Sequence, residues 1–381
     1  MISCEKCGNK DPRSLYQAYG HQICKQCLRF SGAVYAEDVR GFGYEESQTR
    51  IDVSLTVFQQ DIADRICKAI MKSSVFLEAV CGAGKTEMLL PFLKQCFAGN
   101  QKVGWAIPRR QVVLELAQRL QRYFPAMKIV AVCEGFTQDL EGDLVLCTTH
   151  QLYRYRHQFD YLIIDEVDAF PFSNNPVLQA ISEFCYRKQV IYMSATLDEG
   201  LRDKVNRSGF KHLYCPIRPT LELMHEPKEY RLFCWVNFIL MLNYVRKRDH
   251  RVLVFVPTIE SATRLSKWLR WPMITSQSTD KQERIDAFRA DPRAVLISTT
   301  ILERGVTFEN VSVLVFKADH QVFNEASLIQ IAGRIRRGMQ STKGEALFYT
   351  SSKQPAVIGC LTILSMANRS ASIALAKFRQ Q

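Results

Sequence analysis

The sequence predicts an α/β protein with two parallel-sheet lobes and a small cysteine-rich module ahead of them. The chain has 381 residues, of which 47% are hydrophobic, which is enough for two domains of about 100–200 residues and an appendage. From Ser54 onward, short β-branched or aromatic runs alternate with helical patterns, as in βαβ units. Two C-x2-C pairs precede residue 30. Together these observations give the fold class.

Breaks in the apolar pattern divide the chain into three parts. Residues 1–50 form the N-terminal module and its linker, residues 51–216 the first lobe and residues 217–381 the second. In the linker, residues 40–47, glycine and charge replace any apolar period. We place the hinge between the lobes at residues 215–219, because Pro216 and Pro219 each disfavour helix in the preceding residue.

The expected secondary structure follows the same pattern. Strands of the first lobe are predicted at residues 74–80, 102–107, 128–132, 144–148, 161–164 and 190–194, with a helix at 111–123. Strands of the second lobe are predicted at 252–256, 273–276, 295–298, 313–317 and 346–349. The aromatic stretch 233–238 has a helical period, so we expect it to pack in the core rather than to stack on bases.

Net charge and apolar run lengths limit the partners and the location. The formal charge of +12 favours a polyanionic partner, although charge alone does not separate nucleic acid from an anionic membrane surface. The N-terminus lacks the apolar core of a signal peptide, and the apolar stretch 233–245 is too short to span a bilayer. We therefore expect a cytoplasmic protein.

The cysteine pairs Cys4/Cys7 and Cys24/Cys27 predict a zinc site. Residues 8–23 separate the two pairs, a spacing typical of four-cysteine zinc sites. His21 is a possible competing ligand. Such a site contributes folding energy to a segment that is too small for its own core. Whether the module also touches DNA stays open.

A phosphate-binding loop follows the first predicted strand. Glycines let the backbone approach phosphates, a lysine reaches the β- and γ-phosphates, and a threonine hydroxyl ligates Mg²⁺. The residues at these positions are Gly82, Ala83, Gly84, Lys85 and Thr86. Ala79 stands where the usual pattern has its first glycine, which leaves a tight strand-to-helix turn as the alternative.

Two adjacent acids and a basic segment complete the predicted nucleotide site. Asp165 and Glu166 follow an apolar strand, where Asp165 would hold Mg²⁺ and Glu166 would orient or deprotonate the attacking water. Arg334 and Arg337 share one face of a predicted helix and could act as arginine fingers. The alternatives are a capping acidic turn and a solvated basic face.

Taken in order, these motifs resemble the superfamily-2 helicase series from Leu55 to Gly338, which implies two RecA-like lobes that close on ATP. The resemblance assigns adenine recognition to Gln59 and nucleotide binding to Gly305. It assigns contacts with the strand to Pro108, Arg109, Thr148, Thr149, Thr299 and Thr300. It assigns coupling of hydrolysis to lobe movement to Ser194, Ala195, Thr196 and Gln330.

With its leading cysteine module and the segments 165–171 and 300–307, the whole chain resembles the ComFA family of competence ATPases. The resemblance implies an ATP-dependent single-stranded DNA translocase that imports transforming DNA. It also implies a ComFC-like protein, a DNA-processing protein and the membrane DNA channel as partners, with a homo-oligomer and a peripheral place at the inner face of the membrane both possible.

Three other functions stay open at this point. A replication-restart helicase similar to PriA also combines this core with zinc-binding cysteines, but here the cysteines precede the core and no large accessory domain follows Gly338. An RNA helicase would share most of the motifs. A non-enzymatic nucleic-acid-binding scaffold is disfavoured by the intact Lys85, Asp165 and Arg334.

Overall fold

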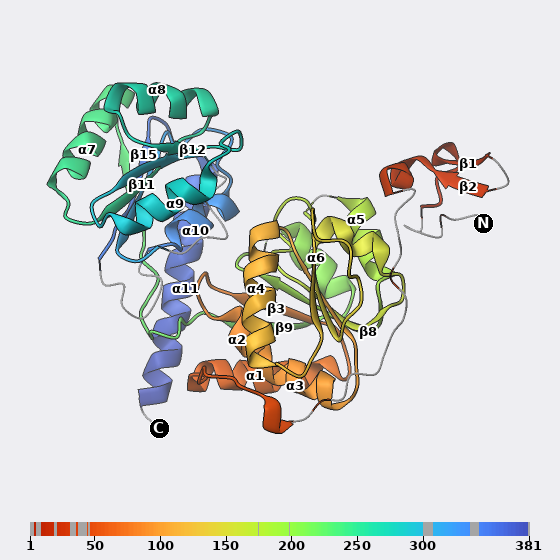
Figure 1. The fold of residues 1–381 in the computed structure, drawn as a ribbon. Coiled ribbons are helices and arrows are strands. Elements are labelled where there is room, and N and C mark those ends of the chain that lie inside the picture. Colours follow the sequence, from red (N-terminus) through yellow and green to blue (C-terminus); the bar gives the residue numbers. More distant parts are fainter. Residues whose placement is uncertain are drawn as a thin grey trace. The chain divides into compact units, whose positions relative to one another are not determined.

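The chain forms two units, which we describe separately (Figure 1). The computed structural model describes residue 4 and residues 9–18, 21–30, 36, 44, 46–173, 175–197, 199–299, 308–335 and 343–379. The first unit comprises Met1–Ala79 and Gly84–Cys215, and the second comprises Val80–Ala83 and Pro216–Gln381. The change from one unit to the other after Cys215 falls within the segment that the sequence marks as a hinge.

The N-terminal module is a small hairpin flanked by short 3-10 helices. Strands β1 (Leu15–Ala18) and β2 (His21–Cys24) pair antiparallel, with Leu15 opposite Cys24. Helix η1 (Pro12–Ser14) precedes the hairpin, and η2 (Lys25–Phe30) follows it directly. The hairpin therefore places Cys24 at a strand end, next to the turn that carries Cys27.

The first unit contains a seven-stranded sheet in which neighbouring strands are parallel. The strand order is β5-β6-β4-β7-β8-β3-β9. The strands are β3 (Val75–Ala79), β4 (Val103–Ile107), β5 (Ile129–Val132), β6 (Leu144–Thr148), β7 (Phe159–Ile164), β8 (Tyr186–Ser194) and β9 (Lys211–Cys215). Strands β4, β6 and β7 are buried almost throughout, which explains their continuous apolar runs.

Helices and 3-10 turns connect these strands. They are η3 (Glu46–Gln48), α1 (Val57–Ile70), α2 (Lys85–Met88), α3 (Leu90–Ala98), α4 (Arg110–Tyr123), η4 (Thr149–Arg154), α5 (Pro176–Glu183) and α6 (Glu199–Arg207). Helix α1 begins with a capping box between Thr56 and Gln59 and buries Ile62, Ile66 and Ile70. Since these three residues recur every four positions, they form one apolar face.

The second unit contains a six-stranded parallel sheet of order β10-β15-β14-β11-β13-β12. Its strands are β10 (Lys228–Arg231), β11 (Arg251–Phe255), β12 (Met273–Ile274), β13 (Val295–Ser298), β14 (Val311–Phe316) and β15 (Ala346–Thr350). Its helices are α7 (Cys234–Lys247), α8 (Ile259–Leu269), α9 (Lys281–Ala290), α10 (Glu325–Ala332) and α11 (Pro355–Arg379). Two parallel α/β sheets confirm the predicted fold class.

Helix α11, blue in Figure 1, is the longest helix that the structure describes. By length and composition alone Pro355–Phe378 could cross a membrane, a test that core helices also pass. Val357, Cys360 and Leu364 on this helix are buried. Asn368 donates to the carbonyl oxygen of Met224 and accepts from the Met224 amide, at 2.8 and 2.7 Å. These contacts join α11 to the chain that enters the second unit.

The expectation that the aromatic stretch 233–238 packs in the core is wrong for its first half. Phe233 and Trp235 are 76% and 67% exposed. The buried face of α7 instead carries Asn237, Met241 and Val245. Asn237 is buried because its side-chain amide donates to two backbone carbonyls, those of Leu232 and Thr350, and paired polar groups are tolerated inside proteins.

Candidate functional site

One edge of the seven-stranded sheet gathers the predicted motifs of the first lobe. Because the strands are parallel, their carboxyl ends share an edge, where open α/β sheets bind their ligands. Strand β3 leads into the phosphate loop, and β7 leads into Asp165. Strands β4 and β6 lead into the two segments assigned to the nucleic-acid strand, and β8 leads into the coupling motif. Five motifs that are far apart in sequence therefore lie along a single edge.

The phosphate loop has the backbone that its glycines predict. Gly82 and Gly84 have φ of 81° and 80°, a left-handed conformation that costs little without a Cβ. A Cβ on Gly84 would lie 2.3 Å from Nε2 of Gln59, so any other residue here would have to displace the end of this side chain. Gln59 also accepts hydrogen bonds through Oε1 from the amide and the hydroxyl of Thr56. The predicted adenine-recognition glutamine is therefore held against the loop that carries Lys85.

Asp165 is a half-buried carboxyl group with an unusual environment. Its backbone amide donates to the Ala106 carbonyl at 2.9 Å, and its Oδ1 accepts from the Glu166 amide at 2.9 Å. Burial raises the pKa of Asp165 to about 6, Lys85 opposes the rise, and the neighbouring Glu166 and Asp168 add to it. A divalent cation would relieve the repulsion among these acids, since cations stabilise the ionised form of nearby carboxylates. The residues present thus fit Mg²⁺.

Glu166 has a strained backbone. Its φ is 53°, a left-handed conformation that costs a residue with a Cβ about 1 kcal/mol or more. The surrounding hydrogen bonds fix it: the Val167 amide donates to Met193 of β8, and the Ala169 amide donates to the Glu166 carbonyl. Such strain is typical of residues that must point in one direction at a functional site.

The coupling motif makes a direct contact with the acidic segment. The Thr196 hydroxyl donates to Oδ2 of Asp168 at 3.2 Å, and the Thr196 amide donates to the Ser194 hydroxyl at 3.0 Å. Ser194, Ala195 and Thr196 are all buried. The hydrogen bond from Thr196 to Asp168 joins the end of β8 to the loop after β7, so a shift of either segment displaces the other.

The two segments assigned to the nucleic-acid strand lie side by side. Ile107 at the end of β4 is in register with Thr148 at the end of β6, which makes Pro108 and Arg109 neighbours of Thr148 and Thr149 across one strand spacing. Pro108, Arg109 and Thr148 are partly exposed, whereas Thr149 is 1% exposed. The contacts of these residues with a strand stay predictions.

In the second unit, Arg334 lies just beyond α10 and is buried, with 2% of its surface exposed. Arg218, also buried, brackets it: Nη2 and Nη1 donate to the carbonyls of Gly333 and Ile335, each at 2.9 Å. Its Nε donates to the carbonyl of Cys81, also at 2.9 Å and in the same unit. The sequence analysis missed Arg218, although a charged residue between Pro216 and Pro219 was a signal.

Gln330 and Gly333 also pack against Cys81 within this unit. The Cys81 thiol donates to Oε1 of Gln330 at 3.2 Å. A Cβ on Gly333 would lie 2.4 Å from the Cβ of Cys81, so this approach requires a glycine. Thr299 follows β13 and is partly exposed. Several predicted residues lie outside the described part of the chain: Cys7, Thr300, Gly305 and Arg337.

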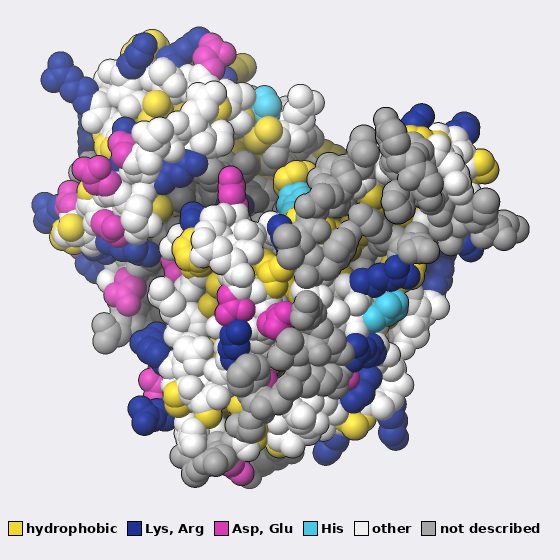
Figure 2. Space-filling view, turned by 45° about the vertical axis from the view of Figure 1, so that its right-hand side comes forward, with side chains coloured by type: hydrophobic (Ala, Val, Ile, Leu, Met, Phe, Trp, Pro, Cys, Tyr) yellow, Lys and Arg dark blue, Asp and Glu magenta, His cyan; other side chains and the backbone are white. Residues whose placement is uncertain are grey.

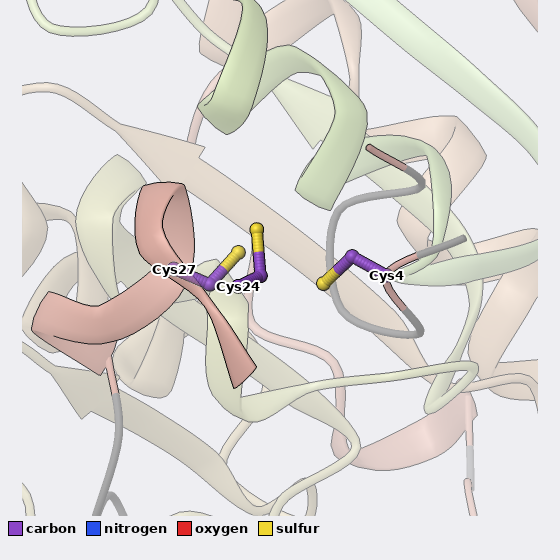
Figure 3. A group of neighbouring side chains, drawn as sticks. All are labelled: Cys4, Cys24 and Cys27. Atoms are coloured by element: carbon purple, nitrogen blue, oxygen red, sulfur yellow. The ribbon is translucent and has the colours of Figure 1, made fainter. Parts of the chain in front are cut away.

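Three of the four predicted zinc ligands come together. The sulfur atoms of Cys4, Cys24 and Cys27 lie within 4.8 Å of one another, and all three residues are buried (Figure 3). A tetrahedral zinc site with Zn–S bonds of about 2.3 Å needs sulfurs about 3.8 Å apart, which small side-chain adjustments would give. The side-chain amide of Asn9 donates from Nδ2 to the Cys24 sulfur at 3.7 Å.

Surface charge does not by itself locate the strand-binding path. Figure 2 shows Lys and Arg side chains spread over the face in view, with acidic side chains among them. The path is therefore better inferred from the sheet edge than from a basic patch.

Comparison with known families matches both lobes to helicase models. Residues 52–199 match the model of the Type III restriction enzyme, res subunit, and residues 236–339 match the helicase conserved C-terminal domain. The chain is 31% identical to the competence protein ComFA of Streptococcus pneumoniae (strain ATCC BAA-255 / R6), over 98% of this chain and 91% of that protein. It is 32% identical to the ComFA of Bacillus subtilis (strain 168), over 93% and 83%.

Similar solved structures bear on the fold alone. Saccharomyces cerevisiae Dbp5 bound to RNA and ADP BeF3 is 16% identical, with a TM-score of 0.62 over 81% of this chain and 87% of that one. Mycobacterium smegmatis helicase Lhr bound to ssDNA and AMP-PNP is 15% identical, with a TM-score of 0.60 over 84% and 48%. The lobes are RecA-like, and the domain matches make the chain an ATP-hydrolysing enzyme of the helicase type, a fold that implies ATP and Mg²⁺.

Proposed function

Because the chain belongs to the ComFA family of competence proteins, we propose that it is an ATP-driven single-stranded DNA translocase that moves transforming DNA into the cytoplasm. The observation that carries the proposal is the shared sheet edge. There, the acidic pair after β7 is one strand away from Pro108 and Arg109 after β4, because Ala106 pairs with Ile164. A strand held at β4 and β6 would thus lie beside the groups that act on ATP.

The residues of the nucleotide site have distinct roles. Lys85 neutralises charge on the β- and γ-phosphates, and Gln59, held against Gly84, selects adenine. Thr86 and Asp165 hold Mg²⁺, which stabilises the charge that develops on the transferred phosphoryl group. Glu166 orients the attacking water, a task for which its fixed backbone suits it.

Residues of the second lobe and the coupling motif turn hydrolysis into movement. Arg334, together with Arg337, stabilises negative charge at the γ-phosphate when the lobes close. Thr196 senses the acidic loop through Asp168, and Gln330 relays the state of the nucleotide. Thr148, Arg109, Thr299 and Thr300 hold the strand backbone, so each cycle of closure and opening alternates the grip of the two lobes.

The N-terminal module binds one structural zinc ion in this proposal. Cys4, Cys24 and Cys27 supply three thiolates that already face one another, and Cys7 supplies the fourth. Four thiolates close a tetrahedral site and leave no position for a substrate, which is the arrangement of structural rather than catalytic zinc. The ion would stabilise the module, whose short hairpin and turns offer little apolar core.

We further propose a cytoplasmic enzyme that works at the inner face of the cell membrane. Its partners there would be a ComFC-like protein, a DNA-processing protein and the membrane DNA channel, and it could act as a homo-oligomer. These assignments follow from membership of the ComFA family. The basic surface, with a net charge of +12, is compatible with both the DNA and an anionic membrane.

The proposal is tested by steady-state ATP hydrolysis with no nucleic acid, single-stranded DNA, duplex DNA and single-stranded RNA. We expect single-stranded DNA to raise kcat at least about tenfold, because closure around the strand completes the site. The Lys85→Ala variant should lose turnover by about 100-fold or more and still bind the strand, since Lys85 contacts phosphate rather than DNA. Displacement of streptavidin from biotinylated strands would then report directional movement.

Each of the other possible results of this assay would indicate a different function. Stimulation by RNA alone would replace DNA translocation with RNA helicase activity, and efficient unwinding of forked duplexes would favour a replication-restart helicase. Normal hydrolysis by Lys85→Ala would refute the phosphate assignment. Strand binding without any hydrolysis in the wild type would favour a scaffold.

A further inference from the structure

The turn after β5 presents an exposed aromatic side chain at the same sheet edge. Phe136 is 47% exposed, whereas Val132 and Cys133 just before it are fully buried. Cys133 and Phe136 exchange two backbone hydrogen bonds of 3.1 and 2.8 Å, and Gly135 between them has a φ of 79°. A two-residue turn closed in this way fixes the backbone of the two residues that close it. Phe136 is one of these two residues, so its ring projects from a fixed backbone position.

An arginine holds this turn from the side. Arg110, the first residue of α4, donates from Nε to the Glu134 carbonyl at 2.8 Å. Its guanidinium carbon lies 5.4 Å from the centre of the Phe136 ring, within the range of a cation–π contact. Since Arg110 itself is exposed, the pair presents a cation and an aromatic ring together at the surface. That combination recognises a nucleotide, because phosphate pairs with the guanidinium and a base stacks on the ring.

The register of the sheet places this pair next to the strand-binding segments. Val132 of β5 and Ala106 of β4 both pair with Cys147 of β6. The chain therefore leaves these three strands at the same level, towards Phe136, Arg110 and Thr148. Adjacent strands are about 4.8 Å apart, which is shorter than the spacing of successive nucleotides in an extended strand. A strand gripped at Arg109 and Thr148 would reach Phe136 within one or two nucleotides.

From this arrangement we infer that Phe136, braced by Arg110, is a stacking platform for one base of the bound single strand. The inference rests on the proposed strand-binding function and adds a contact to a base where the assigned residues hold only the backbone. It requires no preference among bases, because every base has a π face. A solitary exposed phenylalanine on a protein surface is ordinary; the bracing cation and the shared edge distinguish this one.

The test compares two strands of equal length, oligo(dT) and an abasic strand with the same phosphates, in binding to full-length protein. Phe136→Leu keeps an apolar side chain without a π face, and Phe136→Tyr keeps the ring. Removal of one base stack weakens binding by roughly 5- to 150-fold. We expect Phe136→Leu to lose that much affinity for oligo(dT) and none for the abasic strand. Phe136→Tyr should bind both strands as the wild type does.

A kinetic readout separates stacking from a general loss of function. In Phe136→Leu, the oligo(dT) concentration for half-maximal stimulation of ATP hydrolysis should rise by the same factor, while the maximal rate and the strand-free rate stay unchanged. A Phe136→Trp variant adds a direct signal, because its fluorescence should be quenched by oligo(dT) and not by the abasic strand.

Two results would overturn the inference. Equal affinity of Phe136→Leu and wild type for oligo(dT), or an equal loss on both strands, means that Phe136 does not stack on a base. If the wild type is stimulated by single strands in either case, the translocase proposal stands. A wild-type protein that binds no single strand overturns both proposals together.

Discussion

Arg218 offers a sharp test of how motif residues in the second unit are held in place. Its three nitrogens donate to the carbonyls of Cys81, Gly333 and Ile335, each at 2.9 Å, and only 4% of the residue is exposed. In Arg218→Met, the methionine side chain fills much of the space of the arginine side chain, but the three buried carbonyl acceptors lose their charged donor. Each loss costs about 1–3 kcal/mol. Part of this cost is offset because a buried guanidinium need no longer be desolvated.

We therefore expect Arg218→Met to destabilise this region by about 3–5 kcal/mol, a large part of the roughly 5–15 kcal/mol that stabilises a typical domain. Hydrogen–deuterium exchange with mass spectrometry measures it locally. Peptides that span residues 325–335 should open about 100-fold more often or more, since about 1.4 kcal/mol is a factor of ten. ATP hydrolysis should fall as well, because Arg334 lies between two of the released carbonyls.

The matched control is Arg264→Met on α8 of the same unit. Arg264 pairs with Glu260 one turn earlier, at 2.9 Å, and both side chains are exposed, so its loss should cost only about 0.3–0.5 kcal/mol. If exchange in residues 325–335 is the same in the two variants, the three hydrogen bonds of Arg218 contribute nothing to the order of this segment, and the reasoning from buried acceptors is refuted.

Two further predictions follow from the first unit. Thr196→Val removes the hydrogen bond to Asp168. We expect the rate of ATP hydrolysis without a strand to be nearly unchanged. The distance moved per ATP should fall by roughly 2- to 10-fold, which corresponds to the free energy of one such hydrogen bond, as measured by coupled hydrolysis and translocation assays. Equal losses in both assays would place Thr196 in catalysis rather than coupling. Elemental analysis should find one zinc ion per chain. The Cys24→Ser variant should lose this ion and become sensitive to proteolysis before residue 50, because metal binding folds the module. A wild-type protein that contains no zinc but has a stable module would contradict this prediction.

Strands with a continuous apolar run could be predicted from the sequence, whereas two polar edge strands could not. Residues 144–148 and 295–298 were predicted with the bounds of β6 and β13, because their apolar runs record burial. Strands β9 and β10 lie at the edges of their sheets, where β10 exposes three of its four residues and β9 begins with two exposed residues. Neither sequence therefore carries an apolar run of strand length, and the pairing with a neighbouring strand defines them.

The positions of buried polar residues were the second feature that could not be predicted from the sequence. The sequence gives no sign that Asn237 faces the core while Phe233 faces solvent, because that choice depends on two carbonyls, one of them from β15. Arg218 is a similar case, with acceptors more than a hundred residues away. The nucleotide motifs were easier to find because a phosphate loop and an acidic strand end need neighbouring residues only. Contacts between distant segments, such as Thr196 with Asp168, appear once the sheet is assembled.

The strand order in the first unit offers a short route from a bound strand to ATP. The segments proposed to contact DNA follow β5, β6 and β4, and those proposed to act on ATP or to couple its hydrolysis to movement follow β7, β8 and β3, so the two groups occupy successive parts of one edge. At the boundary, the Asp165 amide donates to the Ala106 carbonyl, two residues before Pro108. On this proposal, a displacement of the Pro108 segment by a strand would be passed to Asp165, the proposed Mg²⁺ ligand, through one backbone hydrogen bond. Glu166 already has a strained backbone conformation. A small shift of this backbone would change the direction of the Glu166 side chain. This would explain how a bound strand stimulates ATP hydrolysis without any large rearrangement within the lobe.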